Sequence, residues 1–188
     1  MFGKNGSRNK LLSVAFFVFC NIIKLFYKNI KMGAIFMSLE SVKKQFREEN
    51  LGLEIMEMEQ STATVELAAR AIGVEMGQIA KTMALALKDR NILIVSKGDA
   101  KIDNRKYKDY FKTKAKMLSS EEVFEITGHP VGGVCPFGLK NPLHIYLDKS
   151  LKQYDHVYPA AGAPNAAVKI SIDELQNITK GTWIDVCK

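Results

Sequence analysis

The strongest constraint on how this chain can fold is an abrupt change in character at residue 37. Residues 1–36 contain six lysines and arginines and no Asp or Glu, whereas residues 37–188 contain 21 basic and 20 acidic residues. Most of the net charge of +7 therefore belongs to the first segment. Because the remaining body is nearly neutral, its bulk charge says little about its partners. We expect one folded domain over residues 37–188, long enough for a single full-sized core.

The segment 1–36 forms a separate unit with three interpretations. Its run LLSVAFFVFCNII has 13 uncharged residues, which is too few for a membrane-spanning helix of about 20 residues. Extending the run to residue 36 includes three lysines, which a membrane centre tolerates poorly. The segment is an extension from an upstream start codon, an interfacial helix or anchor, or a cleaved signal without a small-x-small site. The first interpretation is preferred, and membrane contact by residues 1–36 is less favoured.

Cysteine and histidine positions argue against a disulfide framework and against a zinc site. Cys20, Cys135 and Cys187 are far apart and odd in number, and no C-x-x-C pair or Cys/His cluster occurs. The three histidines also lack metal-ligand spacing on a common helix. We therefore expect no metal and no cofactor, and a reducing, cytoplasmic setting.

Short helical and alternating segments follow one another from residue 38 onward. Helices are predicted at 38–50, 64–71, 103–111, 119–128 and 171–178, and the last two begin with capping-box sequences. Strands are predicted at 53–59, 79–87, 92–95, 143–147, 157–160, 167–170 and 183–186, the second and third forming a hairpin. Short strands mixed with short helices and few long crossovers predict an α+β fold with a mixed sheet.

Lys81 interrupts an otherwise apolar predicted strand, within the sequence GQIAKTM of residues 77–83. Strand alternation puts residues 79, 81 and 83 on one face and residues 80, 82 and 84 on the other. A lysine in such surroundings either points to solvent or is held in a pocket by anionic or carbonyl partners. Taken alone, the lysine is better interpreted as a surface residue.

Two glycine-rich segments are candidates for close approach to a ligand. Residues 128–138, GHPVGGVCPFG, contain four glycines and two prolines, which is typical of a rigid loop. Its free N–H groups could bind a carboxylate, phosphate or oxyanion, although a purely structural turn fits equally well. It is not a phosphate loop, since no Ser or Thr follows Lys140. Residues 158–168 surround Gly162 with small side chains, a composition that favours tight packing.

A basic stretch occupies residues 101–116, with seven Lys or Arg residues. The simpler interpretation is a solvated helix face. The functional interpretation is contact with nucleic-acid phosphates, with Tyr107, Tyr110 and Phe111 available for packing or stacking.

Four motifs in order resemble the YbaK/EbsC family, the free-standing relatives of the editing domain of bacterial prolyl-tRNA synthetases. They are GQIAKT at 77–82, Gly98-Asp99, the 128–138 segment and YPAAG at 158–162. The resemblance runs from about Ser38 to Cys187 and excludes the first 36 residues. It implies a mixed, partly barrel-like central β-sheet with surrounding helices. It also implies trans-editing, the hydrolysis of the ester that joins a wrong amino acid to the tRNA 3′ end.

The resemblance assigns roles to three polar residues. Lys81 matches the family lysine, and its ammonium would anchor the aminoacyl or terminal-adenosine part of the substrate rather than act as a general base. Thr82 beside it and Asp148 after the 143–147 strand match polar positions of the family pattern. The implied enzymes are metal-free, with water activated through the substrate's ribose hydroxyl and backbone groups.

The resemblance also implies how the pocket is shaped and what it binds. Gly132, Gly133 and Gly162 would form a small pocket and present backbone N–H groups to the developing oxyanion. Ala163 and Cys135 stand where relatives often have Ser, so either could alter which amino acid fits. The implied partner is the acceptor end of an aminoacyl-tRNA, with an aminoacyl-tRNA synthetase as a further candidate. The alternative is a noncatalytic module that binds tRNA ends or a synthetase.

Overall fold

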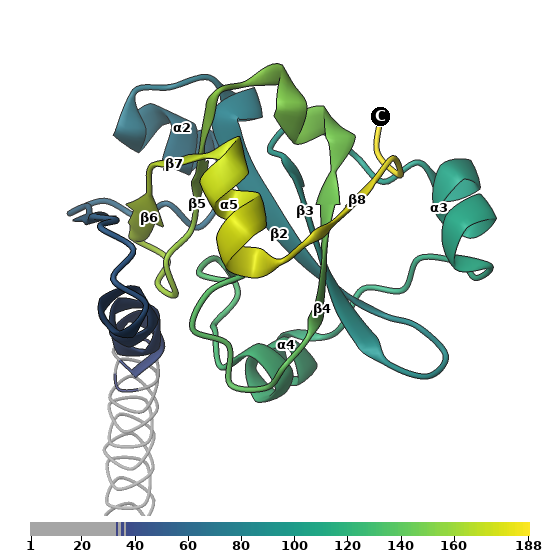
Figure 1. The fold of residues 1–188 in the computed structure, drawn as a ribbon, viewed down its shortest axis with the longest axis horizontal. Helices are drawn as coiled ribbons and strands as arrows, with labels where there is room; N and C mark the ends of the chain where they lie inside the picture. The colour runs from purple at the N-terminus through teal and green to yellow at the C-terminus, as the bar shows by residue number, and fades with distance from the viewer. Residues whose placement is uncertain (1–32, 34, 36) are drawn as a thin grey trace, which may run out of the picture. The chain divides into compact units, whose positions relative to one another are not determined.

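The computed structural model of the chain describes residues 33, 35 and 37–188 (Figure 1). The interpretations of residues 1–36 as an extension, interfacial helix or signal lie outside the described residues. Within the described part, no helix combines the length and apolar character that crossing a membrane requires.

A six-stranded mixed sheet in the order β7-β5-β2-β3-β4-β8 forms the centre of the fold. Its strands are β2 (Ile79–Ala86), β3 (Asn91–Lys97), β4 (His144–Asp148), β5 (His156–Pro159), β7 (Ile170–Ser171) and β8 (Thr182–Ile184). β2 and β3 form the predicted antiparallel hairpin, whereas β5 pairs with β2, β4 with β3 and β8 with β4 in parallel. The prediction of a mixed sheet is therefore confirmed.

A second, two-stranded sheet closes part of the curve. β1 (Ile55–Glu57) and β6 (Ala166–Val168) pair antiparallel. A bridge between Ala160 and Ala167 connects the end of β5 to β6, so the backbone curls from the large sheet into the small one (Figure 1). This arrangement confirms the partly barrel-like α+β fold.

The helices begin and end at the residues that the sequence marks. Residues 37–48 are helical, and the later helices are α2 (Val65–Ile72), α3 (Asn104–Phe111), α4 (Ser120–Thr127) and α5 (Ile172–Thr179). Ser119 and Ser171 form the predicted capping boxes of α4 and α5, and Thr64 accepts a hydrogen bond from the first turn of α2. Two short 3-10 helices, η1 (Met76–Gln78) and η2 (Lys149–Gln153), were not predicted.

β3 is buried on both faces, which explains its continuous apolar sequence. Ile92 and Ile94 belong to a cluster that contains Tyr107 of α3. Val95 belongs to a second cluster, which contains Phe46 of the 37–48 helix. The sheet is thus covered on both sides, with α3 beyond β8 and α2 at the other end in Figure 1.

Candidate active site

The edge of β2 that faces away from β3 has a gap in its pairing. On this edge β2 pairs with β5 at Ile79 and Ala80, and Leu85 forms a bridge with Met117. Residues 81–83 lie between these two contacts and have no strand partner on that edge in the described part of the chain. The gap therefore leaves a short stretch of strand open to a ligand.

Hydrogen bonds next to the gap show which backbone groups face it. Ala84 O accepts from Leu118 N at 3.2 Å, and Ala86 N donates to Lys116 O at 2.9 Å. Alternate residues of a strand direct their N–H and C=O groups to the same edge. The N–H and C=O of Thr82 consequently point into the gap.

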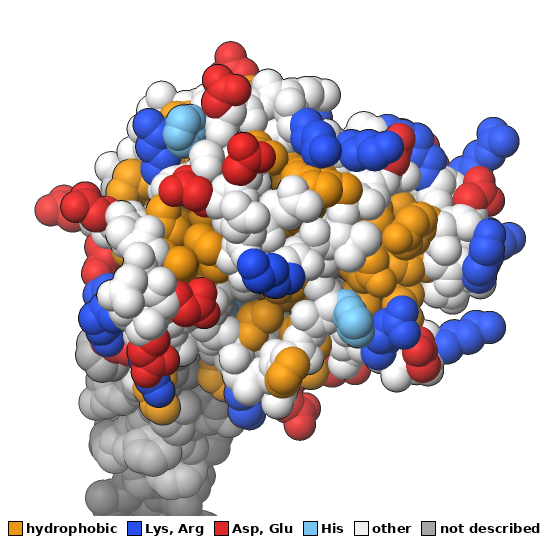
Figure 2. Space-filling model, in the orientation of Figure 1, with side chains coloured by type: hydrophobic (Ala, Val, Ile, Leu, Met, Phe, Trp, Pro, Cys, Tyr) orange, Lys and Arg blue, Asp and Glu red, His pale blue; other side chains and the backbone are white. Residues whose placement is uncertain are grey.

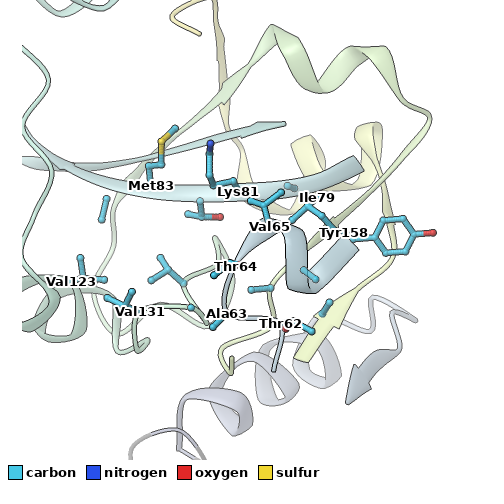
Figure 3. A pocket seen from close by; sticks show the side chains of 18 of the residues that line it. Thr62, Ala63, Thr64, Val65, Ile79, Lys81, Met83, Val123, Val131 and Tyr158 are labelled. Carbon is cyan, nitrogen blue, oxygen red and sulfur yellow. The ribbon is translucent and has the colours of Figure 1, made fainter. Parts of the chain in front are cut away.

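A pocket of about 330 Å³ opens at this gap (Figure 3). Its walls come from the start of α2, the loop after α4, the segment joining β5 to β6, and both faces of β2. Most of the described lining residues are small or apolar, and Lys81 is the one charged residue among them. Val131 and Met117 line the pocket while remaining 60% and 55% exposed. An uncharged organic group with an apolar face fits this lining.

The Lys81 ammonium is held by two backbone carbonyls. Its Nζ donates to Gly98 O at 3.0 Å and to Ala100 O at 2.6 Å. Burial lowers the pKa of Lys81, with a smaller contribution from Lys101, while Cys187, Asp99 and Glu66 oppose the shift. An ammonium has three protons, so two are used here and one remains for a ligand.

Lys81 and the glycine loop lie on different faces of β2. In Figure 3 the side chains of Lys81 and Met83 extend from the strand away from Ala63, Thr64 and Val131. This is the alternation predicted from the sequence. The pocket reaches both faces because it opens along the edge of the strand, so a ligand that contacts both walls must cross that edge.

Thr82 has an unusual environment for a strand residue. Its Oγ1 is buried and has no hydrogen-bond partner among the described residues. Leaving a buried hydroxyl unpaired costs about 1–3 kcal/mol, so such groups often mark a functional site. Since Thr82 lines the pocket, a ligand is a candidate partner for this hydroxyl.

The two glycine-rich segments pack against each other behind the pocket. Gly162 N donates to Gly133 O at 3.1 Å, and a Cβ on Gly133 would lie 2.8 Å from Ala163 N. Gly132 adopts a φ of 89°, in the left-handed region that favours glycine. Gly132 lines the pocket, whereas Gly133, Gly162 and Ala163 do not. These three residues fix the position of the Gly132 loop.

A buried polar network joins these loops to the helix at residues 37–48. Ser38 Oγ lies 2.6 Å from both His129 Nδ1 and Gly162 O, and His129 Nε2 lies 2.7 Å from Phe137 O. Burial lowers the pKa of His129 and raises the pKa of the Cys135 thiol to about 12, so Cys135 is not a ready nucleophile. Sequence reasoning missed this network, because nothing local relates residue 38 to residues 129 and 162.

Asp148 lies outside the pocket. Its buried carboxylate accepts hydrogen bonds from the backbone N–H groups of Ser150, Val186 and Cys187, at 2.9, 2.9 and 3.1 Å. These bonds hold the C-terminal segment against the end of β4. No group of three or more potential metal ligands occurs among the described residues.

Comparison with known proteins decides the family. A family model described as the aminoacyl-tRNA editing domain matches residues 59–178. The chain belongs to this family. YwhH of Bacillus subtilis, an uncharacterized protein, is 49% identical over 154 residues, covering 81% of this chain and 98% of YwhH. EbsC of Enterococcus faecalis, named as a candidate Cys-tRNA(Pro)/Cys-tRNA(Cys) deacylase, is 26% identical over 125 residues, covering 65% of this chain and 76% of EbsC.

A solved structure extends the likeness to three dimensions. It is described as a candidate trans-editing enzyme for prolyl-tRNA synthetase, and it superposes with a TM-score of 0.75 at 32% identity. The match covers 80% of this chain and 97% of the other. The resemblance to the YbaK/EbsC family inferred from the sequence motifs is confirmed.

Proposed function

We propose that this protein hydrolyses the ester bond of mischarged aminoacyl-tRNA in trans. The observation that carries the proposal is the pocket at the open edge of β2, which is lined by Lys81, Thr82 and Gly132. The buried hydroxyl of Thr82 has no hydrogen-bond partner among the described residues. Membership in the aminoacyl-tRNA editing family supports the reaction class. The names of EbsC and of the trans-editing enzyme support a mischarged aminoacyl-tRNA as the substrate.

The position of the pocket favours one way of placing the ester. The ester carbonyl lies beside Thr82, whose backbone N–H points into the gap and whose buried hydroxyl is unpaired among the described residues. One end of the aminoacyl-adenosine reaches the Lys81 side of β2, and the other end contacts the Gly132 loop. Exposed Val131 and Met117 offer apolar surface for the adenine ring or the aliphatic part of the substrate.

This placement supplies the catalytic effects that the reaction needs. An aminoacyl ester is already reactive, so fixed orientation and donors aimed at the developing oxyanion can provide much of the acceleration. Lys81 acts as a positioning cation rather than a base, because its Nζ donates hydrogen bonds to Gly98 O and Ala100 O. The ammonium form keeps a third N–H for the substrate, whereas a neutral amine bonded to both carbonyls would have none left.

The direct test is a deacylation panel with tRNAs charged with Ala, Ser, Cys, Thr and Pro. We expect the wild-type protein to cleave at least one of these esters faster than buffer. Lys81→Ala should lower kcat/KM at least 100-fold, and Lys81→Arg should recover part of the loss because its side chain can still donate to the carbonyls. The surface substitution Lys169→Ala provides the matched lysine control.

Folding must be measured beside activity, since Lys81 also fastens residues 98–100. Circular dichroism and thermal unfolding of each variant separate loss of structure from loss of catalysis. If wild type cleaves no ester in the panel, the enzyme proposal is wrong and the noncatalytic tRNA-end or synthetase-binding module becomes the better interpretation. A cytoplasmic location is part of the proposal, consistent with the free thiols of Cys135 and Cys187.

A further inference from the structure

The basic stretch at residues 101–116 is a local concentration of charge on a nearly neutral body. It contains seven basic residues and two acidic ones. The first part forms α3, and the chain then continues without regular structure to Met117, which bridges to Leu85 of β2. Figure 2 shows lysine and arginine side chains projecting at the end of the molecule that carries α3.

The segment after α3 presents its lysines in a row. Lys112, Lys114 and Lys116 are exposed, whereas Thr113 and Ala115 between them are partly buried. In an extended segment, alternate residues point the same way and lie about 7 Å apart. Lys114 and Lys116 therefore point the same way in the segment that leads to Met117. Lys112 begins the row at the left-handed C-cap of α3, where its φ is 57° and this spacing does not apply.

Three lysines of the basic stretch differ from its other basic side chains, most of which have a partner within the protein. Lys106 forms an ion pair with Asp185 at 2.6 Å, and Arg105 lies 4.0 Å from Asp109. Exposed Lys114 and Lys116 form no ion pair among the described residues, and neither does Lys108 on α3. Among the described residues, these three ammonium groups therefore have no carboxylate within ion-pair distance, although Lys116 lies close enough to Glu122 to lower the pKa of that carboxyl.

The row leads directly to the candidate active site. Lys116 precedes Met117 and Leu118, which both line the pocket. Hydrogen bonds from Ala86 N to Lys116 O and from Leu118 N to Ala84 O fix this end of the row to the open edge of β2. A nucleic-acid strand whose end occupies the pocket can therefore place its next phosphates along these lysines.

We propose that Lys108, Lys112, Lys114 and Lys116 bind the phosphates of the tRNA acceptor end whose terminal aminoacyl-adenosine occupies the pocket. The inference rests on the proposed function for the identity of the RNA. Side-chain ammonium groups contact phosphates without reading sequence, so this surface would position the 3′ strand and the first pairs of the stem. Tyr110, 48% exposed on α3, offers an adjacent ring for stacking.

The test compares RNA binding with hydrolysis of a substrate that lacks the stem. The triple variant Lys108→Gln, Lys114→Gln, Lys116→Gln removes three exposed lysines that form no ion pair. It keeps Lys112, the C-cap residue of α3, because its Nζ donates to Asp109 O at 2.6 Å. Fluorescence anisotropy measures binding of an uncharged acceptor-stem minihelix RNA at several salt concentrations. Hydrolysis of the Ala, Ser and Cys esters of adenosine measures the pocket alone.

We expect the triple variant to bind the minihelix at least tenfold more weakly than wild type. The slope of log affinity against log salt should become shallower by about 2, because each single-strand phosphate contact contributes about 0.7. Hydrolysis of the adenosine esters should stay within twofold of wild type, since these esters have no stem phosphates. The control variant Lys44→Gln, Arg47→Gln, Lys169→Gln removes equal charge from the 37–48 helix and from the junction of β6 and β7. These elements lie away from α3 in Figure 1, so the control should bind like wild type.

Each other outcome has a definite meaning. If the triple variant binds the minihelix as tightly as wild type, or if the control loses affinity equally, the docking surface is wrong. If wild type does not bind the minihelix, the inference is also overturned. If wild type hydrolyses no adenosine ester, the proposed function is contradicted instead. The docking surface is still tested in that case, because minihelix binding is measured separately.

Discussion

At the scale of single residues, the Thr82 hydroxyl is expected to lower the stability of the fold and to contribute to substrate binding. Its hydroxyl is buried and unpaired in the described part of the chain. Valine has the same shape without the hydroxyl, so Thr82→Val should raise the free energy of unfolding by about 1 kcal/mol. If the hydroxyl binds the substrate, the same change should lower kcat/KM for the cleaved aminoacyl-tRNA by about 10-fold to 100-fold.

Urea unfolding and deacylation kinetics on the same preparation measure the two effects of Thr82→Val. Thr82→Ser is the matched control, because it keeps the hydroxyl and should retain activity within a few fold. A Thr82→Val variant that is less stable and fully active would show that the hydroxyl has a structural partner and no role toward the substrate.

His129 predicts a pH dependence of stability. Burial lowers its pKa below the ordinary value of 6.5, so the unfolded chain binds the proton first as the pH falls. The stability contributed by the neutral ring is present above about pH 6.5 and is lost as the pH decreases below that value. One such group changes the free energy of unfolding by at most about 1.4 kcal/mol per pH unit.

Urea unfolding at pH 7.5, 6.5 and 5.5 compares wild type with His129→Gln. The variant should be less stable at pH 7.5, because it loses the network with Ser38 and Phe137, and its stability should change less between pH 6.5 and pH 5.5. Equal pH slopes in the two proteins would contradict a lowered pKa at this position. The exposed histidines, His144 and His156, are common to both proteins and cancel in the comparison.

At the scale of elements, the contact between the two glycine loops sets the position of Gly132. A Cβ on Gly133 would lie 2.8 Å from backbone atoms of Gly162 and Ala163, which cannot move aside as a side chain could. Gly133→Ala should therefore lower the free energy of unfolding by about 1–3 kcal/mol. It should also reduce kcat/KM by displacing the pocket wall.

Gly73→Ala is the matched control for the loop substitution. Gly73 ends α2 with a φ of 80° and has nothing within 4 Å of an added Cβ, so alanine there meets only the strain of the left-handed conformation. Thermal unfolding and deacylation assays should show reduced stability in both variants and reduced activity in Gly133→Ala alone. Equal activity of the two variants would show that the contact between the glycine loops does not control the shape of the pocket.

The elements were predictable where the determinants are local. The capping boxes at Ser119 and Ser171 start α4 and α5 at the expected residues, and the apolar runs around Lys81 form the expected hairpin. The open edge of β2 could not be predicted, because it depends on where β5 and Met117 stop pairing. The family resemblance grouped Asp148 with the site, and in the structure its carboxylate accepts hydrogen bonds from the C-terminal backbone.

At the scale of the whole molecule, the site is a place where segments distant in sequence meet at one strand. Lys81 and Thr82 come from β2, Gly132 from the loop after α4, and Met117 from the end of the basic row. Family motifs located three of these four residues but said nothing about the faces of β2 that they occupy. These four residues can therefore contact one ligand only after the whole domain has folded.

The division at residue 37 predicts that the domain folds without the N-terminal segment. Ile35 packs against the main core, so a chain starting at Met37 should lose about 1 kcal/mol of stability relative to one starting at Gly33. Both should unfold cooperatively and hydrolyse aminoacyl-tRNA within twofold of the full chain. Both truncations also remove six positive charges, so minihelix affinity that persists would assign RNA binding to the domain rather than to the N-terminal segment. Thermal unfolding followed by circular dichroism measures the stability of the truncated chains, and fluorescence anisotropy measures their affinity for the minihelix. A Met37 chain that unfolds without a cooperative transition would contradict the division at residue 37.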